Sequence, residues 1–353
     1  MEKKRFIGLD LVRVCAILFV FLHHSVTILG RLDADLYSGE WALSLFLREL
    51  TYSCVPLFLI LSGYLQKNKK LSFSYYKSIF PLYLSYAVIC ILTLAAVAIC
   101  EKSFALNPAE AIYKILNFTA NEYSWYFEMF LGLFLLIPFL NCMYNGIETR
   151  GGRLALILSL AFLTLLPDTI IGFSPYYDNT SATLALNILP DFFEPLYPVT
   201  YYFIGAFIAD YKPRLNPWLK IPAVLIAALI PTVITVGYTY ARASYAWYML
   251  NGFQNVCVCF TAIAVFLALY DVKTCTTPVN FILKHISLCA FEMYMFSYIW
   301  DSYIYKVSSV PRALMTLAVF ALSFLSAFLL RLCLSPVNRL VFHLFDKAEQ
   351  AKN

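Results

Sequence analysis

FIGLDLVRVCAILFVFLHHSVTIL, residues 6–29, is apolar enough to cross a membrane, yet it contains four ionisable side chains: Asp10, Arg13, His23 and His24. Ionisable groups inside a membrane span are costly, and they usually face the interior of a helix bundle or a water-filled cavity. The segment therefore predicts a membrane helix that carries functional side chains.

The composition of the whole chain agrees with a membrane protein. Of its 353 residues, 61% are hydrophobic and 13% are charged, whereas soluble domains average about 25% charged residues. Apolar runs of about 18 residues or more recur along the chain, which excludes the short alternating strands of a β-barrel. We expect an all-α, polytopic integral membrane protein with about ten membrane helices, near residues 6–30, 41–65, 76–100, 123–145, 153–172, 183–209, 218–240, 247–270, 280–304 and 312–333.

Basic residues indicate the orientation of these helices. The segments on the side of the N-terminus contain more than twice as many Lys and Arg residues as the opposite, outer segments, to which Arg48 belongs. Arg13 is the one basic residue assigned to the membrane itself. The positive-inside rule then places both termini and residues 66–75 in the cytoplasm, and it places the loop of residues 173–190 outside. The net charge of +5 is accounted for by inner loops beside lipid head groups, so no nucleic-acid partner is expected. Residues 1–335 form the predicted transmembrane domain, and residues 336–353 form an amphipathic cytoplasmic tail.

Helix geometry separates the ionisable residues of the first segment. At 100° per residue, Asp10, Arg13 and His24 share one face, and His23 points about 100° away from His24. Asp10 and Arg13 are one turn apart and can form an ion pair, while His24 lies ~16 Å further along the axis. The pair can bind a ligand, or it can simply hold helices together. His23 is expected to be a packing residue.

Several motifs resemble one known family. The pattern LDLVRVCAILFVFLHH, with Asp10, Arg13 and His24 at fixed intervals, is similar to the first helix of the type-3 acyltransferases, the integral-membrane O-acetyltransferases that modify bacterial cell-surface glycans. Four further motifs follow in the same order as in that family: VPLFLILSGYL at 55–65, WYFEMFLGLFLLIPFL at 125–140, YYFIGAFIAD at 201–210 and ISLCAFEMYMFSYI at 286–299. The resemblance extends over nearly the whole chain.

The resemblance implies transfer of an acetyl or other short acyl group from cytoplasmic acetyl-CoA to a sugar hydroxyl outside. His24 would be the general base, or it would carry the acyl group as an acyl-histidine. From its position along its own helix, Glu128 is expected at a depth similar to that of His24, where it would orient the imidazole or bind sugar. By the same argument Glu292, near the inner side, would instead partner Arg13. The donor would be held by residues of the inner half of the membrane and the inner loops: Asp10, Arg13, Lys67, Lys69, Lys70, Lys77 and Glu292. The implied acceptor is a cell-surface polysaccharide or a lipid-linked sugar.

Two departures from the family pattern limit which residue roles of the family can be assigned to this chain. The loop KNKKLSFSYYKSIFP, residues 67–81, contains lysines where the family usually has arginines, and lysine binds phosphate as a point charge without the bidentate fork. The late motif has Ser297 where histidine is common and Glu292 where glycine is usual. A mechanism that needs a second histidine at that position therefore fails for this chain.

Two other classes of protein remain open from the residues alone. About ten spans with intramembrane charges also suit a transporter or flippase, although no inverted repeat is visible. A membrane binding protein without enzymatic activity is the third class. The cysteines show no C-x-x-C spacing, so no metal site is expected. Binding of acyl-CoA would separate the enzyme from both alternatives.

Overall fold

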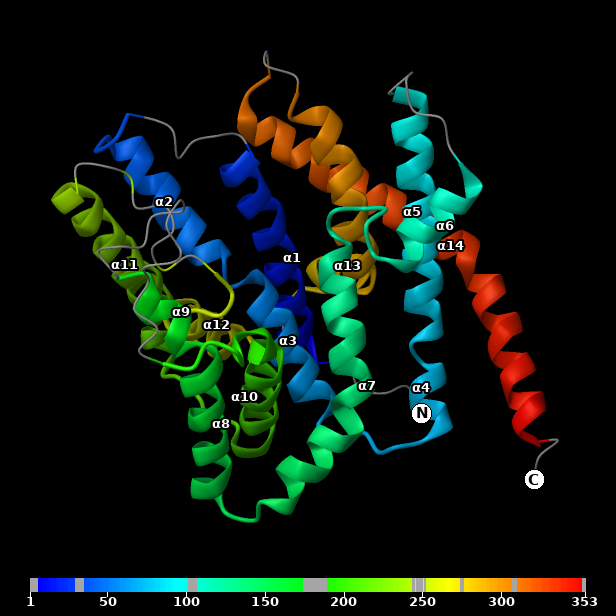
Figure 1. The fold of residues 1–353 in the computed structure, drawn as a ribbon, viewed down its shortest axis with the longest axis horizontal. Helices are drawn as coiled ribbons and strands as arrows, with labels where there is room; N and C mark the ends of the chain where they lie inside the picture. Colours follow the sequence, from blue (N-terminus) through cyan, green and yellow to red (C-terminus); the bar gives the residue numbers. More distant parts are fainter. Residues whose placement is uncertain are drawn as a thin grey trace. The chain divides into compact units, whose positions relative to one another are not determined.

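The computed structural model describes residues 6–28, 35–100, 107–173, 189–242, 245, 250, 252–273, 276–306 and 310–350. Within these ranges the chain forms helices and no strand, as expected for an all-α protein (Figure 1). Six of the helical segments are long and apolar enough to cross a membrane, and shorter apolar helices accompany them. The predicted outer loop, residues 173–190, lies almost entirely outside the described residues. The orientation of the helices relative to the cytoplasm remains a prediction.

The chain divides into two compact units. Unit 1 comprises Met1–Lys70 and Leu136–Ser287, and unit 2 comprises Leu71–Leu135 and Leu288–Asn353. The described helices of unit 1 are α1 (Ile7–Ile28), α2 (Gly39–Thr51), α3 (Cys54–Gln66), α8 (Arg150–Thr164), α9 (Leu166–Ile171), the 3-10 turn η3 (Glu194–Leu196), α10 (Tyr197–Tyr211), α11 (Pro217–Arg242) and α12 (Val256–Leu269).

Unit 2 contains α4 (Phe73–Lys77), α5 (Phe80–Cys100), α6 (Pro108–Leu116) and α14 (Arg312–Gln350). Two further helices, α7 (Ser124–Gly146) and α13 (Thr277–Ile304), begin in one unit and end in the other. Within unit 2, α5 packs against α6 and α14.

The core of unit 1 forms where α3 packs against α10 and α1, and where α2 packs against α1 and α11. Glycine makes the first of these contacts close. A Cβ atom on Gly63 of α3 would overlap the carbonyl oxygen of Tyr202, and one on Gly205 of α10 would overlap that of Ile60. The two backbones therefore approach closely at these glycines, and small residues at such crossings are typical of membrane helices.

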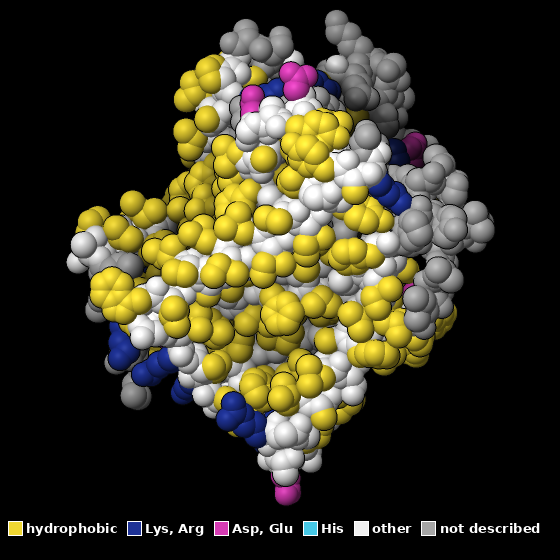
Figure 2. Space-filling view, turned by 90° about the vertical axis from the view of Figure 1, so that its left-hand side faces the viewer, with side chains coloured by type: hydrophobic (Ala, Val, Ile, Leu, Met, Phe, Trp, Pro, Cys, Tyr) yellow, Lys and Arg dark blue, Asp and Glu magenta, His cyan; other side chains and the backbone are white. Residues whose placement is uncertain are grey.

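The outer surface of unit 1 is suited to lipid. Many large apolar side chains of α11 are exposed, among them Trp218, Ile221 and Val233. Figure 2 shows the molecule from the left-hand side of Figure 1. Hydrophobic side chains cover the broad middle of this face, and several Lys and Arg side chains lie along its lower rim. An apolar band with basic residues at its edge is the arrangement expected for a protein that lies in a bilayer.

Several predicted spans differ from the helices, among them the following three. The span expected at 41–65 is two helices, α2 and α3, because the chain turns at Tyr52 and Ser53. The span expected at 183–209 is described as a helix only from Tyr197. The last helix does not end at 333 but continues to Gln350 with Pro336 inside it. The amphipathic tail expected from residue 336 therefore continues this helix, because the proline ring removes only one backbone donor and helices in membrane proteins tolerate this loss.

Candidate functional site

The ion pair expected on the first helix is present and is bridged by a serine. In α1 the Arg13 Nη1 atom lies 3.9 Å from the Asp10 Oδ1 atom. Ser287 of α13 donates a hydrogen bond from Oγ to Asp10 Oδ1 over 2.7 Å, and it accepts one from Arg13 Nη1 over 2.9 Å. Asp10 is buried, whereas Arg13 is partly exposed. The sequence predicted the pair from its spacing but missed Ser287, which belongs to the late motif.

A cavity of about 330 Å³ opens beside Asp10 in unit 1. The first turn of α1 and the first two turns of α13 line it, with Ile7 and Leu283 among its apolar residues and Asn280 and Lys284 among its polar ones. An ammonium group and a carboxylate therefore lie at the edge of a largely apolar cavity. This combination can hold an apolar chain that ends in an anionic group.

The predicted donor-binding lysines of unit 1 differ in their surroundings. Lys67 forms an ion pair with Asp210 of α10, and the second oxygen of that carboxylate accepts a 2.8 Å hydrogen bond from Arg153 Nη1 of α8. Burial lowers the pKa of the Lys67 amine, and the nearby charges of Arg153 and Lys212 lower this pKa further. Lys69 and Lys70 are exposed. Arg153 thus supplies, from another helix, a guanidinium group next to the loop in which the sequence contains only lysines.

The predicted donor-binding residues of unit 2 are paired within that unit. Lys77 Nζ lies 2.8 Å from Asp346 Oδ1 of α14. The Glu292 carboxylate accepts hydrogen bonds from Arg331 Nη1 over 3.0 and 3.1 Å and from Ser85 Oγ over 3.2 Å. Arg331, an arginine within the last apolar helix, is therefore the cation that neutralises Glu292. The part of these residues in donor binding remains a prediction.

Glu128, the carboxylate expected to support His24, lies in the part of α7 that belongs to unit 2, and its side chain is exposed. Buried polar contacts surround the start of this helix. Asn121 Nδ2 donates to Thr93 Oγ1 and to the carbonyl oxygen of Met295, and the Tyr123 hydroxyl donates to Asp301 Oδ2 over 2.8 Å. The predicted pairing of Glu128 with His24 is not tested by these contacts and stays a prediction.

The two histidines at the other end of α1 have different environments. His23 Nδ1 lies 3.2 Å from Thr51 Oγ1, and its ring packs on that of Tyr52 with 4.4 Å between centroids. Because Thr51 Oγ1 uses its own hydrogen toward the carbonyl oxygen of Leu47 at 2.7 Å, it accepts from Nδ1, and the lone pair of neutral His23 is then on Nε2. The His24 ring lies 6.4 Å from the His23 ring, centroid to centroid. His23 is a packing residue, as the helix phase predicted.

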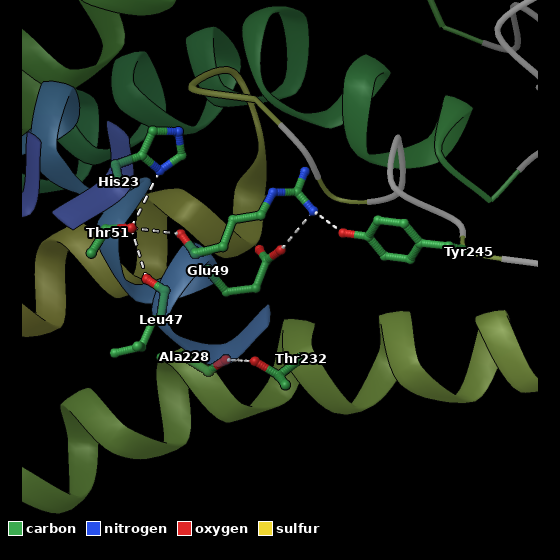
Figure 3. Close-up of polar contacts among 8 residues, drawn as sticks. His23, Leu47, Glu49, Thr51, Ala228, Thr232 and Tyr245 are labelled. Carbon is green, nitrogen blue, oxygen red and sulfur yellow. Dashed lines mark hydrogen bonds and ion pairs between the residues drawn. The ribbon is translucent and has the colours of Figure 1, made fainter. Parts of the chain in front are cut away.

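A second buried charge pair lies on α2 and was missed by sequence reasoning (Figure 3). Arg48, which the sequence placed in an outer segment, is only 3% exposed. Its Nη1 atom donates to the Tyr245 hydroxyl over 2.8 Å and lies 3.8 Å from Glu49 Oε1. Burial raises the pKa of the Tyr245 phenol to about 12, although the positive charge of Arg48 opposes this rise. Arg48 is therefore a buried cation within a helical segment that is apolar enough to cross a membrane.

The fold and these buried groups define a multi-pass membrane protein with ionisable side chains held between its helices. A family model described as an acyltransferase domain, Acyl_transf_3, matches residues 6–332. The chain belongs to this family, the type-3 acyltransferases, and the protein is a membrane acyltransferase. No curated protein and no solved structure matches the chain.

Proposed function

We propose that the protein is an O-acetyltransferase of the bacterial plasma membrane, which transfers an acetyl group from cytoplasmic acetyl-CoA to a hydroxyl of an extracytoplasmic glycan. The observation that carries the proposal is the layout of α1. The Asp10–Ser287–Arg13 contacts and the adjacent cavity lie near one end of this helix, and the imidazoles lie ~16 Å away near the other. A donor that enters at one end can present its acyl group at the other.

In this proposal Arg13 and Lys284 face the anionic and polar parts of the donor, and the exposed Lys69 and Lys70 attract its phosphates. The pantetheine chain of the donor runs along α1 toward His24. His24 removes the proton from the acceptor hydroxyl while the hydroxyl oxygen attacks the thioester carbonyl carbon. The carbon–sulfur bond breaks, and the CoA thiolate leaves and takes up a proton. The products are an acetyl ester and free CoA.

The direct test compares cells with and without the gene. Mild base releases ester-linked acetate from isolated cell-surface glycans, and we expect this acetate to fall markedly when the gene is removed and to return when it is restored. Membranes that contain the protein should also bind radiolabelled acetyl-CoA. A protein that binds no acetyl-CoA and whose loss leaves the acetate unchanged would contradict the proposal.

Substitution of Arg13 gives a sharper test of acetyl-CoA binding. Arg13→Ala should weaken acetyl-CoA binding by about tenfold or more, because a hydrogen-bonded charge facing an anionic or polar donor is lost. Asp10 keeps its hydrogen bond to Ser287, so the variant should remain folded. Binding to the wild-type protein should weaken as salt is added. Equilibrium binding in nanodiscs measures both effects.

Arg339→Ala is the matched control, because Arg339 is an exposed residue of α14. It removes the same charge and should leave acetyl-CoA affinity unchanged. If Arg13→Ala also left the affinity unchanged, the Asp10–Ser287–Arg13 contacts would be a structural clamp between α1 and α13.

A further inference from the structure

Two fully buried polar side chains of α2 have atoms without a hydrogen-bond partner. Glu49 and Trp41 are each 0% exposed. Among the described residues, neither carboxylate oxygen of Glu49 nor the Nε1 atom of Trp41 has a hydrogen-bond partner. The Arg48 guanidinium is 3.8 Å from Glu49, which gives an ion pair but no hydrogen bond. Buried polar groups are nearly always hydrogen-bonded, so such orphaned atoms call for a specific explanation.

These side chains belong to one connected cluster in unit 1. Trp41 and Arg48 are seven residues apart on α2 and therefore share a face. Tyr245 joins them, because its ring meets that of Trp41 with 5.8 Å between centroids and its hydroxyl accepts from Arg48. The Arg48 guanidinium lies 5.3 Å from the centroid of the Tyr52 ring, and that ring packs on His23. The cluster thus extends from the orphaned groups to His23 of α1, and Figure 3 shows His23, Glu49 and Tyr245 of it.

The chemistry of the cluster fits a sugar ring. A carboxylate accepts hydrogen bonds from hydroxyl groups, while indole and guanidinium N–H groups donate to hydroxyl oxygens. Aromatic rings offer flat apolar faces beside these polar groups. The positive charge of Arg48 offsets the negative charge of Glu49, which favours a polyhydroxyl ligand over a strongly anionic one.

We propose that Trp41, Arg48, Glu49 and Tyr245 form the acceptor subsite and bind a sugar of the glycan through its hydroxyl groups. This inference rests on the proposed acetyl transfer. Because Glu49 and Trp41 have no exposed surface, entry of the sugar requires the Arg48–Tyr245 hydrogen bond to open, and a sugar hydroxyl then takes the place of the phenol. One hydroxyl of the bound sugar lies beside the histidines, where His24 takes its proton during attack on the thioester.

The test uses the full-length protein in nanodiscs and, as the acceptor, surface glycan extracted from cells that lack the gene. Initial rates are measured against glycan concentration and against acetyl-CoA concentration. Glu49→Gln removes the charge at nearly constant volume, and Trp41→Phe removes the indole N–H while keeping an aromatic ring, although a smaller one. We expect each to raise the KM for glycan by about tenfold to a hundredfold, because a hydrogen bond to a buried group is lost. Acetyl-CoA affinity should change by less than about twofold.

Glu40→Gln and Trp218→Phe are the matched controls, since Glu40 is an exposed carboxylate on the same helix and Trp218 is 86% exposed. Both should leave the KM for glycan unchanged. An unchanged glycan KM in Glu49→Gln and Trp41→Phe would overturn the subsite. Parallel losses of acetyl-CoA affinity and Tm in these two variants would also overturn the subsite, because they would show that the cluster stabilises the fold and does not bind the glycan. If the wild-type protein bound acetyl-CoA but transferred nothing to the glycan, the proposed function would fail and the subsite with it.

Discussion

His24→Ala is expected to abolish acetyl transfer while acetyl-CoA still binds. A positioned general base contributes typically 10²–10⁴-fold to a rate, and loss of the base affects turnover more than binding of the ground state. His24 is assigned this part because it shares the face of Asp10 and Arg13 on α1. The measurement is the acetate that mild base releases from surface glycans, at matched protein level, together with acetyl-CoA binding to isolated membranes.

His23→Ala is the neighbouring control, and it should keep most of the transfer activity. Its imidazole hydrogen-bonds to Thr51 and packs on Tyr52, so its loss should lower the Tm. If His23→Ala abolished transfer and His24→Ala did not, the base would be His23, acting through the Nε2 lone pair that its contact with Thr51 leaves available. Full activity in both variants would remove histidine catalysis from the mechanism.

Features that depend on local spacing could be predicted from the sequence. The Asp10–Arg13 pair follows from a separation of one helical turn, and the packing position of His23 follows from the helix phase. Apolar runs of sufficient length predicted most of the helices, including α7, α11 and α13. In each case the residues that determine the feature are close to one another in the sequence.

Features that depend on packing between distant segments could not be predicted. Arg153 and Asp210 surround Lys67 from helices far along the chain, and no periodicity relates these three positions. The Glu292–Arg331 pair likewise joins α13 to α14. The sequence counts Arg48 among the outer basic residues, whereas the packing of α2 on α1 and α11 buries both Arg48 and Glu49.

Gly63→Ala and Gly205→Ala are each expected to prevent the protein from reaching its native fold. A methyl group on either glycine would overlap a backbone carbonyl oxygen of the facing helix, that of Tyr202 or of Ile60. A backbone carbonyl cannot move aside as a flexible side chain can, so α3 and α10 would have to separate along their whole contact. Inserting a methyl group into a well-packed core costs about 1–3 kcal/mol, and we expect at least the upper end here. That is a large part of the stability of a typical protein.

Size-exclusion profiles and Tm values of detergent-solubilised protein measure this effect. Gly132→Ala and Gly237→Ala are the controls, because an added Cβ at either helical position meets no atom within 4 Å. These two should keep the Tm or raise it slightly, since alanine favours helix over glycine by about 1 kcal/mol. A monodisperse Gly63→Ala protein with an unchanged Tm would mean that α3 and α10 do not cross at these glycines. The α3–α10 contact also fixes the position of α1, which packs on α3, so the same substitutions should reduce acetyl-CoA binding in step with the loss of folded protein.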